Sequence, residues 1–248
     1  MRILILGGTA DAAALAGRLA GLADTDVMLS LAGRTRHPLA APVPMRVGGF
    51  GGVAGLKTWL SENRTDCVID ATHPFAAMIS RNAARACDEL GIPIVALHRP
   101  AWSKMEGDRW IEVADMSEAV GALGEKSRRT FLTIGRIEIA AFAAAPQHHY
   151  LVRTIEPVGD ALPVPHVTAI EARGPFDEEA EVGLLRQHRI EIVVSKNSGG
   201  PATYAKIAAA RRLGLPVVMI ARPESPDVAS VGSVDEALVW LAGHRPPP

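Results

Sequence analysis

The first residues that could do chemistry follow the apolar run Ile3–Leu6. Gly7, Gly8 and Thr9 come directly after it, and an alanine-rich segment predicted to be helical begins at Ala10. Glycine lets the backbone approach a pyrophosphate closely, and the free N–H groups of a helix start attract anions. The pattern therefore predicts that these four residues bind the phosphates of a dinucleotide. A glycine-rich turn without a ligand is the alternative, because the G-x-G-x-x-G spacing is absent.

The end of the next apolar run bears on which dinucleotide would bind. A site for NAD presents an Asp or Glu to the ribose roughly 20 residues after the glycine loop. The sequence has no acid at this point and offers Ser30, Arg34 and Arg36 instead. A hydroxyl and a guanidinium suit a 2′-phosphate, which favours NADPH over NADH. Arginines on a solvated loop would leave the same pattern.

A second glycine-rich turn surrounds Phe50. Gly48, Gly49, Gly51 and Gly52 flank it, after one predicted strand and before a predicted helix. Four glycines in five positions cost backbone entropy, so the chain needs unusual backbone angles or the close approach of a ligand there. Gly49, Phe50 and Gly51 are predicted cofactor contacts, with Phe50 covering an adenine or a substrate face. A flexible loop is the other interpretation.

Thr72 and His73 follow the buried run Val68–Ala71. Ligands of open α/β sheets bind outside the carboxyl ends of the strands, where these two side chains would lie. Thr72 is a predicted cofactor contact and His73 a predicted catalytic residue, as a hydrogen-bond donor or a proton source. A histidine that only caps a helix is the alternative.

A similar strand, polar loop and helix occur in the second half of the chain. The predicted substrate-binding residues are Arg136, Ser195, Lys196, Ser198, Gly199 and Gly200. A cation, two hydroxyls and a helix start near Pro201 together suit a carboxylate. Lys196 is also a predicted catalytic residue, because it could protonate the product, and a contact with a cofactor phosphate is the remaining alternative.

Composition excludes several classes of function. The chain has 248 residues, with 26 Lys+Arg against 27 Asp+Glu, so it lacks the basic surface typical of a nucleic-acid-binding protein. Cys67 and Cys87 have no Cys or His at metal-ligand spacing, and no metal site is predicted. No stretch is apolar enough for a signal peptide or a membrane helix, which predicts a cytoplasmic protein that binds no membrane.

Short apolar runs alternate with helical segments along the whole chain, which is typical of a doubly wound α/β fold with parallel strands. The predicted strands are Ile3–Leu6, Val27–Leu31, Met45–Val47, Val68–Ala71, Ile94–Leu97, Trp110–Val113, Phe131–Ile134, Tyr150–Thr154, Val167–Ile170, Ile192–Ser195 and Val217–Ile220. Helices are predicted at 10–22, 53–63, 75–90, 117–124, 137–144, 178–188, 202–213 and 234–242. A boundary at His98–Pro100 divides the chain into domains 1–98 and 99–248.

Four stretches together resemble the precorrin-6A reductase family of cobalamin biosynthesis. They are GGTADAAALA, GGFGG, DATHPFA and SKNSGGPATYAKIAAARRLGLPVVMIARP, in this order over nearly the whole chain. The first loop departs from the family pattern, which more often continues Glu-Gly-Arg after Gly-Gly-Thr. The resemblance implies two Rossmann-like domains with mainly parallel sheets and a cleft between them. Domain 1–98 would bind NADPH, and domain 99–248 would form the substrate side.

The implied activity is the NADPH-dependent reduction of one double bond in precorrin-6A, which gives precorrin-6B. The implied partners are a tetrapyrrole-derived substrate fringed with carboxylates and neighbouring enzymes of the pathway. Two alternatives remain open. One is the same reduction on the cobalt-loaded macrocycle of the anaerobic route, and the other is a non-enzymatic dinucleotide sensor, which would have no need for the SKNSGG segment.

Overall fold

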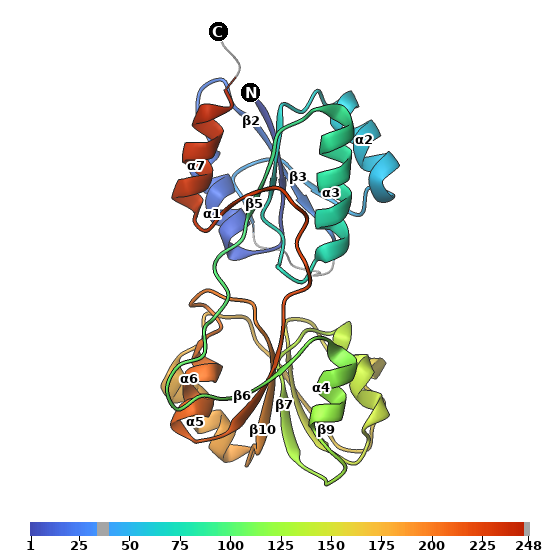
Figure 1. Cartoon of the computed structure of the whole chain (residues 1–248), viewed down its shortest axis with the longest axis vertical. Coiled ribbons are helices and arrows are strands. Elements are labelled where there is room, and N and C mark those ends of the chain that lie inside the picture. The colour runs from blue at the N-terminus through green and yellow to red at the C-terminus, as the bar shows by residue number, and fades with distance from the viewer. Residues whose placement is uncertain (34–39, 246–248) are drawn as a thin grey trace. The chain divides into compact units, whose positions relative to one another are not determined.

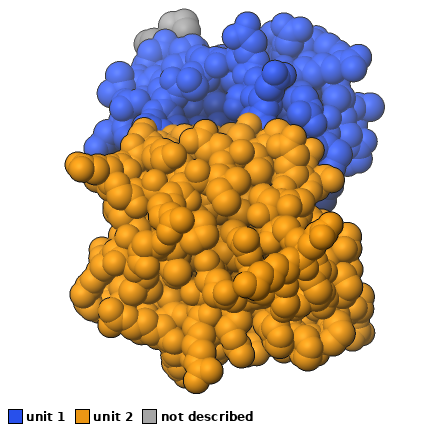
Figure 2. All heavy atoms as spheres, turned by 60° about the horizontal axis from the view of Figure 1, so that its bottom comes forward, with its two compact units in different colours: residues 1–100, 223–248 blue, residues 101–222 orange. Residues whose placement is uncertain are grey.

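The computed structural model describes residues 1–33 and 40–245. The chain forms two compact units, coloured separately in Figure 2. Unit 1 contains residues 1–100 and 223–248, and unit 2 contains residues 101–222. The predicted boundary near residue 98 therefore lies within two residues of the observed one, but the predicted second domain extends too far, since the chain returns to unit 1 after Arg222.

Unit 1 is built on a sheet of six strands, all paired in parallel. Its strands are β1 (Arg2–Leu6), β2 (Asp26–Leu31), β3 (Met45–Val47), β4 (Cys67–Asp70), β5 (Ile94–Leu97) and β12 (Ala229–Val231). Their spatial order is β12-β5-β4-β1-β2-β3. The central strands β1 and β4 are apolar almost throughout, because helices cover both faces of the sheet.

Two pairs of helices make those layers. α1 (Ala10–Leu19) and α7 (Val234–Gly243) cover one face, and α2 (Gly52–Glu62) and α3 (Ala77–Leu90) cover the other (Figure 1). Each pair buries its own apolar cluster against the strands. Unit 1 is thus a three-layer α/β sandwich.

The C-terminal segment belongs to unit 1 because it completes this sandwich. β12 pairs in parallel with β5, with Ser230 opposite Ala96. Ala237 and Leu241 of α7 are buried in the same cluster as α1. The prediction of a second domain running to 248 was wrong. The short strand β12 has two exposed residues and no apolar run from which a strand could be predicted.

Unit 2 repeats the architecture with another six-stranded, all-parallel sheet. Its strands are β6 (Arg109–Val113), β7 (Arg129–Leu132), β8 (His149–Thr154), β9 (Val167–Glu171), β10 (Ile192–Lys196) and β11 (Pro216–Ile220), in the order β6-β11-β10-β7-β8-β9. Its helices are α4 (Met116–Ala122), α5 (Glu178–Gln187) and α6 (Ala205–Arg212), with the 3₁₀ helices η1 (Glu138–Ala144) and η2 (Gly159–Ala161).

Two predicted helices of unit 2 differ from the structure. The segment predicted as a helix at 137–144 is the 3₁₀ helix η1. The helix predicted at 202–213 begins only at Ala205, because 202–204 form a turn. Pro201 therefore does not lie in the first turn of a helix.

Each sheet has one point where the strand order reverses. In unit 1 it lies between β1 and β4, and in unit 2 between β7 and β10. In open parallel sheets, ligands bind outside the carboxyl ends of the strands at such switch points. The loops after these four strands are the structural basis for a site in each unit.

Candidate functional site

The glycine loop of unit 1 follows β1 directly. Gly7 packs so tightly that a Cβ there would lie 2.6 Å from Leu29 Cδ1. Gly8 has φ +114°, and a Cβ there would meet no atom of residues 1–33 and 40–245 within 4 Å. The loop thus needs glycine at Gly7 for packing against β2 and at Gly8 for its backbone angle. Gly8 leaves open space beside the backbone, as a bound phosphate requires.

Thr9 joins the two sides of the unit 1 switch point. Its Oγ1 caps α1 by accepting a hydrogen bond from the Ala12 N–H at 3.1 Å. The same hydroxyl donates to the Ala71 carbonyl, in the loop after β4, at 2.8 Å. Ala10 is the first residue of α1, so the positive end of the helix dipole lies at this loop.

Thr72 and His73 follow β4 at the same edge of the sheet. The Thr72 hydroxyl is buried, donates to Asp70 Oδ1 at 2.6 Å and lies 3.3 Å from Ser80 Oγ. His73 Nδ1 accepts a hydrogen bond from the Phe75 N–H at 3.3 Å. Both side chains thus have roles within the turn that leads to α3, and their contacts with a ligand stay predictions.

Ser30, one of the predicted 2′-phosphate contacts, is bonded to an arginine that the sequence pattern does not indicate. Arg46, on β3, donates to Ser30 Oγ at 2.8 Å and to the carbonyls of Gly48 and Gly49 at 3.0 and 3.2 Å. Its guanidinium lies 3.8 Å from the ring centre of Phe50. Burial lowers the pKa of Arg46 from its usual value. The sequence of the three-residue strand β3 contains no pattern that predicts this role of Arg46.

Phe50 is thus covered on one side by Arg46, and its ring also contacts Trp59 of α2 edge-on. Gly51, with φ +81°, is the N-cap of α2. A Cβ on Gly55 would lie 1.7 Å from the Phe50 carbonyl oxygen, so α2 packs directly on this turn. The glycine-rich turn therefore has a structural role whether or not Gly49, Phe50 and Gly51 contact a cofactor.

Arg34 and Arg36 lie outside the described residues. The charges available at this edge of unit 1 therefore include Arg46 and also Arg99, which follows β5. Arg99 Nη1 lies 2.7 Å from Asp11 Oδ2, in the first turn of α1.

In unit 2, Lys196 lies at the switch point as the last residue of β10. Its side chain is 9% exposed, and Nζ lies 2.5 Å from Glu138 Oε1. Glu138 begins η1, after β7, and is itself 28% exposed. The strands β7 and β10 are adjacent, so an ion pair bridges the two loops at this point. Glu138 cannot be selected from the sequence, because its contact with Lys196 spans 58 residues.

The loop after β10 is held by side chains from distant parts of unit 2. The Trp102 N–H donates to Asn197 Oδ1 at 2.7 Å, and Asn197 Nδ2 donates to the Trp102 carbonyl at 3.0 Å. The Trp102 indole N–H donates to the Gly200 carbonyl at 2.8 Å. Arg222 donates to the carbonyls of Asn197 and Ser198 at 2.8 and 3.0 Å. These hydrogen bonds thus hold the SKNSGG segment in a defined conformation.

The remaining predicted residues of unit 2 lie around this loop. Ser195 is buried, and its hydroxyl donates to the Lys196 carbonyl at 3.2 Å. Gly199 and Gly200 have φ +68° and +72°, angles that favour glycine. Arg136, after β7, donates from Nε to the Val158 carbonyl at 3.4 Å. The structure therefore brings Lys196 and the 197–200 loop together, while Arg136 bonds to the segment after β8.

A buried charged cluster lies beside this region of unit 2. Arg153 forms a bidentate ion pair with Glu181, and its guanidinium lies 3.7 Å from the Phe176 ring centre. Lys206 Nζ donates to the Thr203 carbonyl at 2.7 Å. Burial, with a smaller contribution from Arg153, lowers the pKa of Lys206 to about 7, while Glu181 acts in the opposite direction. The cluster has two cations and one carboxylate.

Within residues 1–33 and 40–245, no group of three or more His, Cys, Asp or Glu side chains could hold a metal ion. The same described residues contain no helix that is both long and apolar enough to cross a membrane.

The fold and these loops define a class: a two-unit α/β protein with Rossmann-type strand order in unit 1 and a glycine loop at its switch point. The chain belongs to the precorrin-6x reductase CbiJ/CobK family, whose model matches residues 2–242.

Individual relatives agree with this assignment. The chain is 52% identical to the precorrin-6A reductase of Sinorhizobium sp, over 97% of this chain and 94% of that protein. It is 30% identical to the cobalt-precorrin-6A reductase of Salmonella typhimurium, over 89% and 87% of the two chains. A solved structure described as CobK precorrin-6A reductase has 46% identity and a TM-score of 0.94, and the match covers 100% of this chain and 98% of that one.

Proposed function

We propose that this enzyme reduces one double bond of precorrin-6A with NADPH, giving precorrin-6B, in the cytoplasm and beside other enzymes of cobalamin biosynthesis. The observation that carries the proposal is the 52% identity, over nearly the whole of both chains, to a protein named precorrin-6A reductase. The glycine loop at a topological switch point supports the dinucleotide part of it.

The residues of unit 1 fit a dinucleotide. Gly8 leaves space beside its backbone, and the amino end of α1 lies at the same loop, held by the Thr9 cap. Gly7, Gly8, Thr9 and Ala10 would hold the pyrophosphate through backbone N–H groups and the helix dipole. Bound NADPH supplies a hydride, and the chain has to orient the nicotinamide and exclude competing reactions.

Ser30 and Arg34 would bind the 2′-phosphate. The Ser30 hydroxyl accepts a hydrogen bond from Arg46, which brings a further guanidinium to this edge of the sheet. Two positive groups and no acid in the segment from Ser30 to Arg36 favour NADPH over NADH.

The carboxylates of the macrocycle would bind in unit 2. Lys196 and the 197–200 loop offer a cation, hydroxyls and glycine N–H groups at the switch point. Glu138 holds the Lys196 ammonium in place, since their polar atoms lie 2.5 Å apart. A substrate carboxylate would then meet a fixed cation, which lowers the entropic cost of binding.

The second candidate function is the same reduction on cobalt-precorrin-6A. The relative named for that substrate is 30% identical, against 52% for the one named for precorrin-6A. The difference favours the metal-free substrate.

The test follows the absorbance of the macrocycle with purified protein and NADPH. We expect a spectral change with one NADPH oxidised per macrocycle, faster with metal-free than with cobalt-loaded substrate. A faster reaction with the cobalt-loaded form would transfer the assignment to the second candidate. Tight NADPH binding with neither macrocycle reduced would instead identify a dinucleotide sensor.

A further inference from the structure

The short segment from Arg99 to Trp102 carries the chain from unit 1 into unit 2, with the crossing between Pro100 and Ala101. At its unit 1 end, Arg99 Nη1 lies 2.7 Å from Asp11 Oδ2. Asp11 is in the first turn of α1, directly after the glycine loop. The segment is therefore tied to the candidate cofactor loop.

Its unit 2 end is tied to the candidate substrate loop. Trp102 exchanges two hydrogen bonds with the Asn197 side chain, at 2.7 and 3.0 Å, and its indole N–H donates to the Gly200 carbonyl at 2.8 Å. The indole is also flanked by the Tyr204 ring, with centres 5.6 Å apart, and by Lys206 Nζ at 4.9 Å from the ring centre. These contacts hold the indole independently of its N–H.

The return crossing is fastened to the same loop. The chain passes back to unit 1 between Arg222 and Pro223. Arg222 donates from Nε to the Asn197 carbonyl at 2.8 Å and from Nη2 to the Ser198 carbonyl at 3.0 Å. Both crossings thus end on the 197–200 loop, although the two fastening residues are far apart in sequence.

We propose that Arg99 and Trp102 are positioning residues that couple the cofactor loop of unit 1 to the substrate loop of unit 2, so that each ligand raises the affinity for the other. This rests on the proposed function, because it takes NADPH and precorrin-6A as the ligands.

The segment is short and stiff enough for this role. Four residues span at most about 14 Å even when fully extended. Pro100 fixes its own φ and restricts Arg99 to extended conformations. A displacement of Asp11 on cofactor binding would therefore pull on Arg99, and the short segment would carry part of that displacement to Trp102. Linkage then requires that the effect be reciprocal.

The coupling can be measured without turnover by using NADP⁺, which has no hydride to transfer. The Kd of precorrin-6A is measured with and without saturating NADP⁺, and the Kd of NADP⁺ with and without precorrin-6A. We expect the wild-type protein to bind each ligand about fivefold or more tightly when the other is present, with equal ratios in the two directions.

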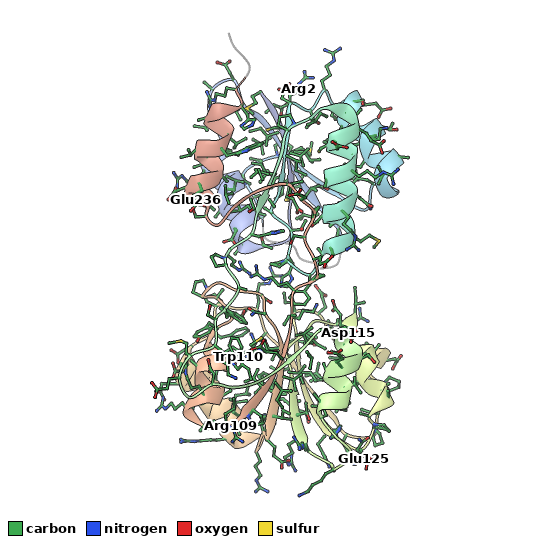
Figure 3. The ribbon with its side chains drawn as sticks, in the orientation of Figure 1. Arg2, Arg109, Trp110, Asp115, Glu125 and Glu236 are labelled. Atoms are coloured by element: carbon green, nitrogen blue, oxygen red, sulfur yellow. The ribbon has the colours of Figure 1, made fainter. Side chains whose placement is uncertain are left out.

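Trp102→Phe keeps a ring in the same position but removes the N–H that bonds to Gly200. We expect it to lower the coupling ratio at least threefold while the Kd of NADP⁺ alone stays within twofold. The matched control is Trp110→Phe, since the buried Trp110 indole on β6 (Figure 3) has no hydrogen-bond partner within the described part of the chain. It should keep the wild-type ratio.

Asp11→Asn tests the other end of the segment. It removes the charge that pairs with Arg99 and should lower the coupling ratio, whatever it does to cofactor affinity alone. Asp235→Asn is its control, because Asp235 pairs with Arg18 in the last turn of the same helix. If Trp102→Phe fails to fold, Asn197→Asp removes the bond from the Asn197 amide to Trp102 instead.

The outcomes separate this inference from the proposed function. Failure of the wild-type protein to bind or reduce precorrin-6A would overturn the proposed function. Tight binding of both ligands with a wild-type ratio of one would overturn the coupling alone. Equal losses of coupling in Trp102→Phe and Trp110→Phe would overturn the role of the Trp102 hydrogen bond.

Discussion

Units 1 and 2 have the same architecture but differ in what occupies the switch point of the sheet. In unit 1 the position holds a glycine loop, with open space beside Gly8 and a helix start capped by Thr9. In unit 2 it holds the Lys196–Glu138 ion pair and a loop tied down by side chains. One sheet edge offers backbone N–H groups, and the other offers a fixed side-chain cation.

Under the proposed function, this difference would let one fold recognise two kinds of anion. A pyrophosphate has closely spaced oxygens that suit a run of backbone N–H groups, which only glycine lets come near. Carboxylates spread around a macrocycle lie farther apart and suit single cations on side chains. Switch-point position therefore marks where a ligand binds, and the residues there decide which ligand.

The buried polar groups of the two units also differ. In unit 1, the buried polar cluster at the site consists of neutral hydroxyls around one carboxylate. Asp70 accepts a hydrogen bond from the Thr72 hydroxyl, which also lies close to the Ser80 hydroxyl. One buried cluster of unit 2 combines two cations, Arg153 and Lys206, with one carboxylate, Glu181. Buried ions contribute little to stability unless fully paired, so unit 2 carries a charge that costs stability.

The largest expected effect tests the open loop of unit 1. Gly8→Val places a branched side chain where the proposal puts the pyrophosphate and strains a backbone angle of +114°. We expect NADPH to bind about a hundredfold more weakly, about 3 kcal/mol, measured by fluorescence titration. Gly21→Val is the control, because Gly21 has φ +76° and open space but lies beyond the other end of α1. Loss of NADPH affinity in both variants would assign the effect to strain alone.

The second prediction tests the paired cation of unit 2. Lys196→Ala should raise the KM for precorrin-6A about thirtyfold, because a charged hydrogen bond of about 2 kcal/mol is lost. The Kd of NADPH without substrate should stay within twofold. The reverse pattern, with weaker NADPH binding and an unchanged KM, would place Lys196 against a cofactor phosphate.

Much of the fold can be predicted from the sequence because the central strands of both sheets are buried on two faces. The sequence predicts every strand of the described residues except β12, whose sequence Ala-Ser-Val has only one large apolar residue. The boundary at the first crossing is also predicted. The return of the chain to unit 1 cannot be predicted, because it depends on which sheet edge the short strand β12 joins.

A site residue can be predicted when its neighbours in the sequence explain why that residue type occurs at that position. Gly7, Gly8 and Thr9 follow a strand and precede a helix, so their positions at the switch point follow from the pattern. Glu138, Trp102 and Arg46 could not be found this way. Glu138 and Trp102 act on residues 58 and 95 positions away, and only the strand order brings such segments together.

The third prediction concerns the cofactor preference of unit 1. Arg34 follows β2 in the sequence, where a 2′-phosphate would lie. Arg34→Ala should weaken NADPH binding about tenfold, or about 1.5 kcal/mol, and leave NADH binding unchanged. Comparing the two Kd values in one variant removes any general loss of stability. Equal losses for both cofactors would leave the discrimination to Arg46 and Ser30.

The smallest effect concerns the buried charge of unit 2. Lys206→Met removes an ammonium whose pKa is lowered to about 7, mainly by burial and then by Arg153, with Glu181 opposing. Below pH 7 the folded protein buries this charge, whereas the unfolded chain keeps it in water. The wild-type protein therefore regains stability as the pH rises above 7, since the folded state releases the proton while the unfolded state retains it.

We accordingly expect Lys206→Met to be more stable than the wild-type protein at pH 6, by about 1 kcal/mol, because an apolar residue of similar volume often replaces a buried ion without loss. The difference should shrink and then change sign as the pH is raised from 7 to 9, because over this range the wild-type protein regains about 2 kcal/mol. Urea unfolding at four pH values from 6 to 9 measures this difference. The substitution also removes the hydrogen bond from Lys206 to the Thr203 carbonyl, which lies in the turn before α6. A variant less stable than the wild-type protein by the same amount at every pH would show that this bond, and not the buried charge, dominates at Lys206.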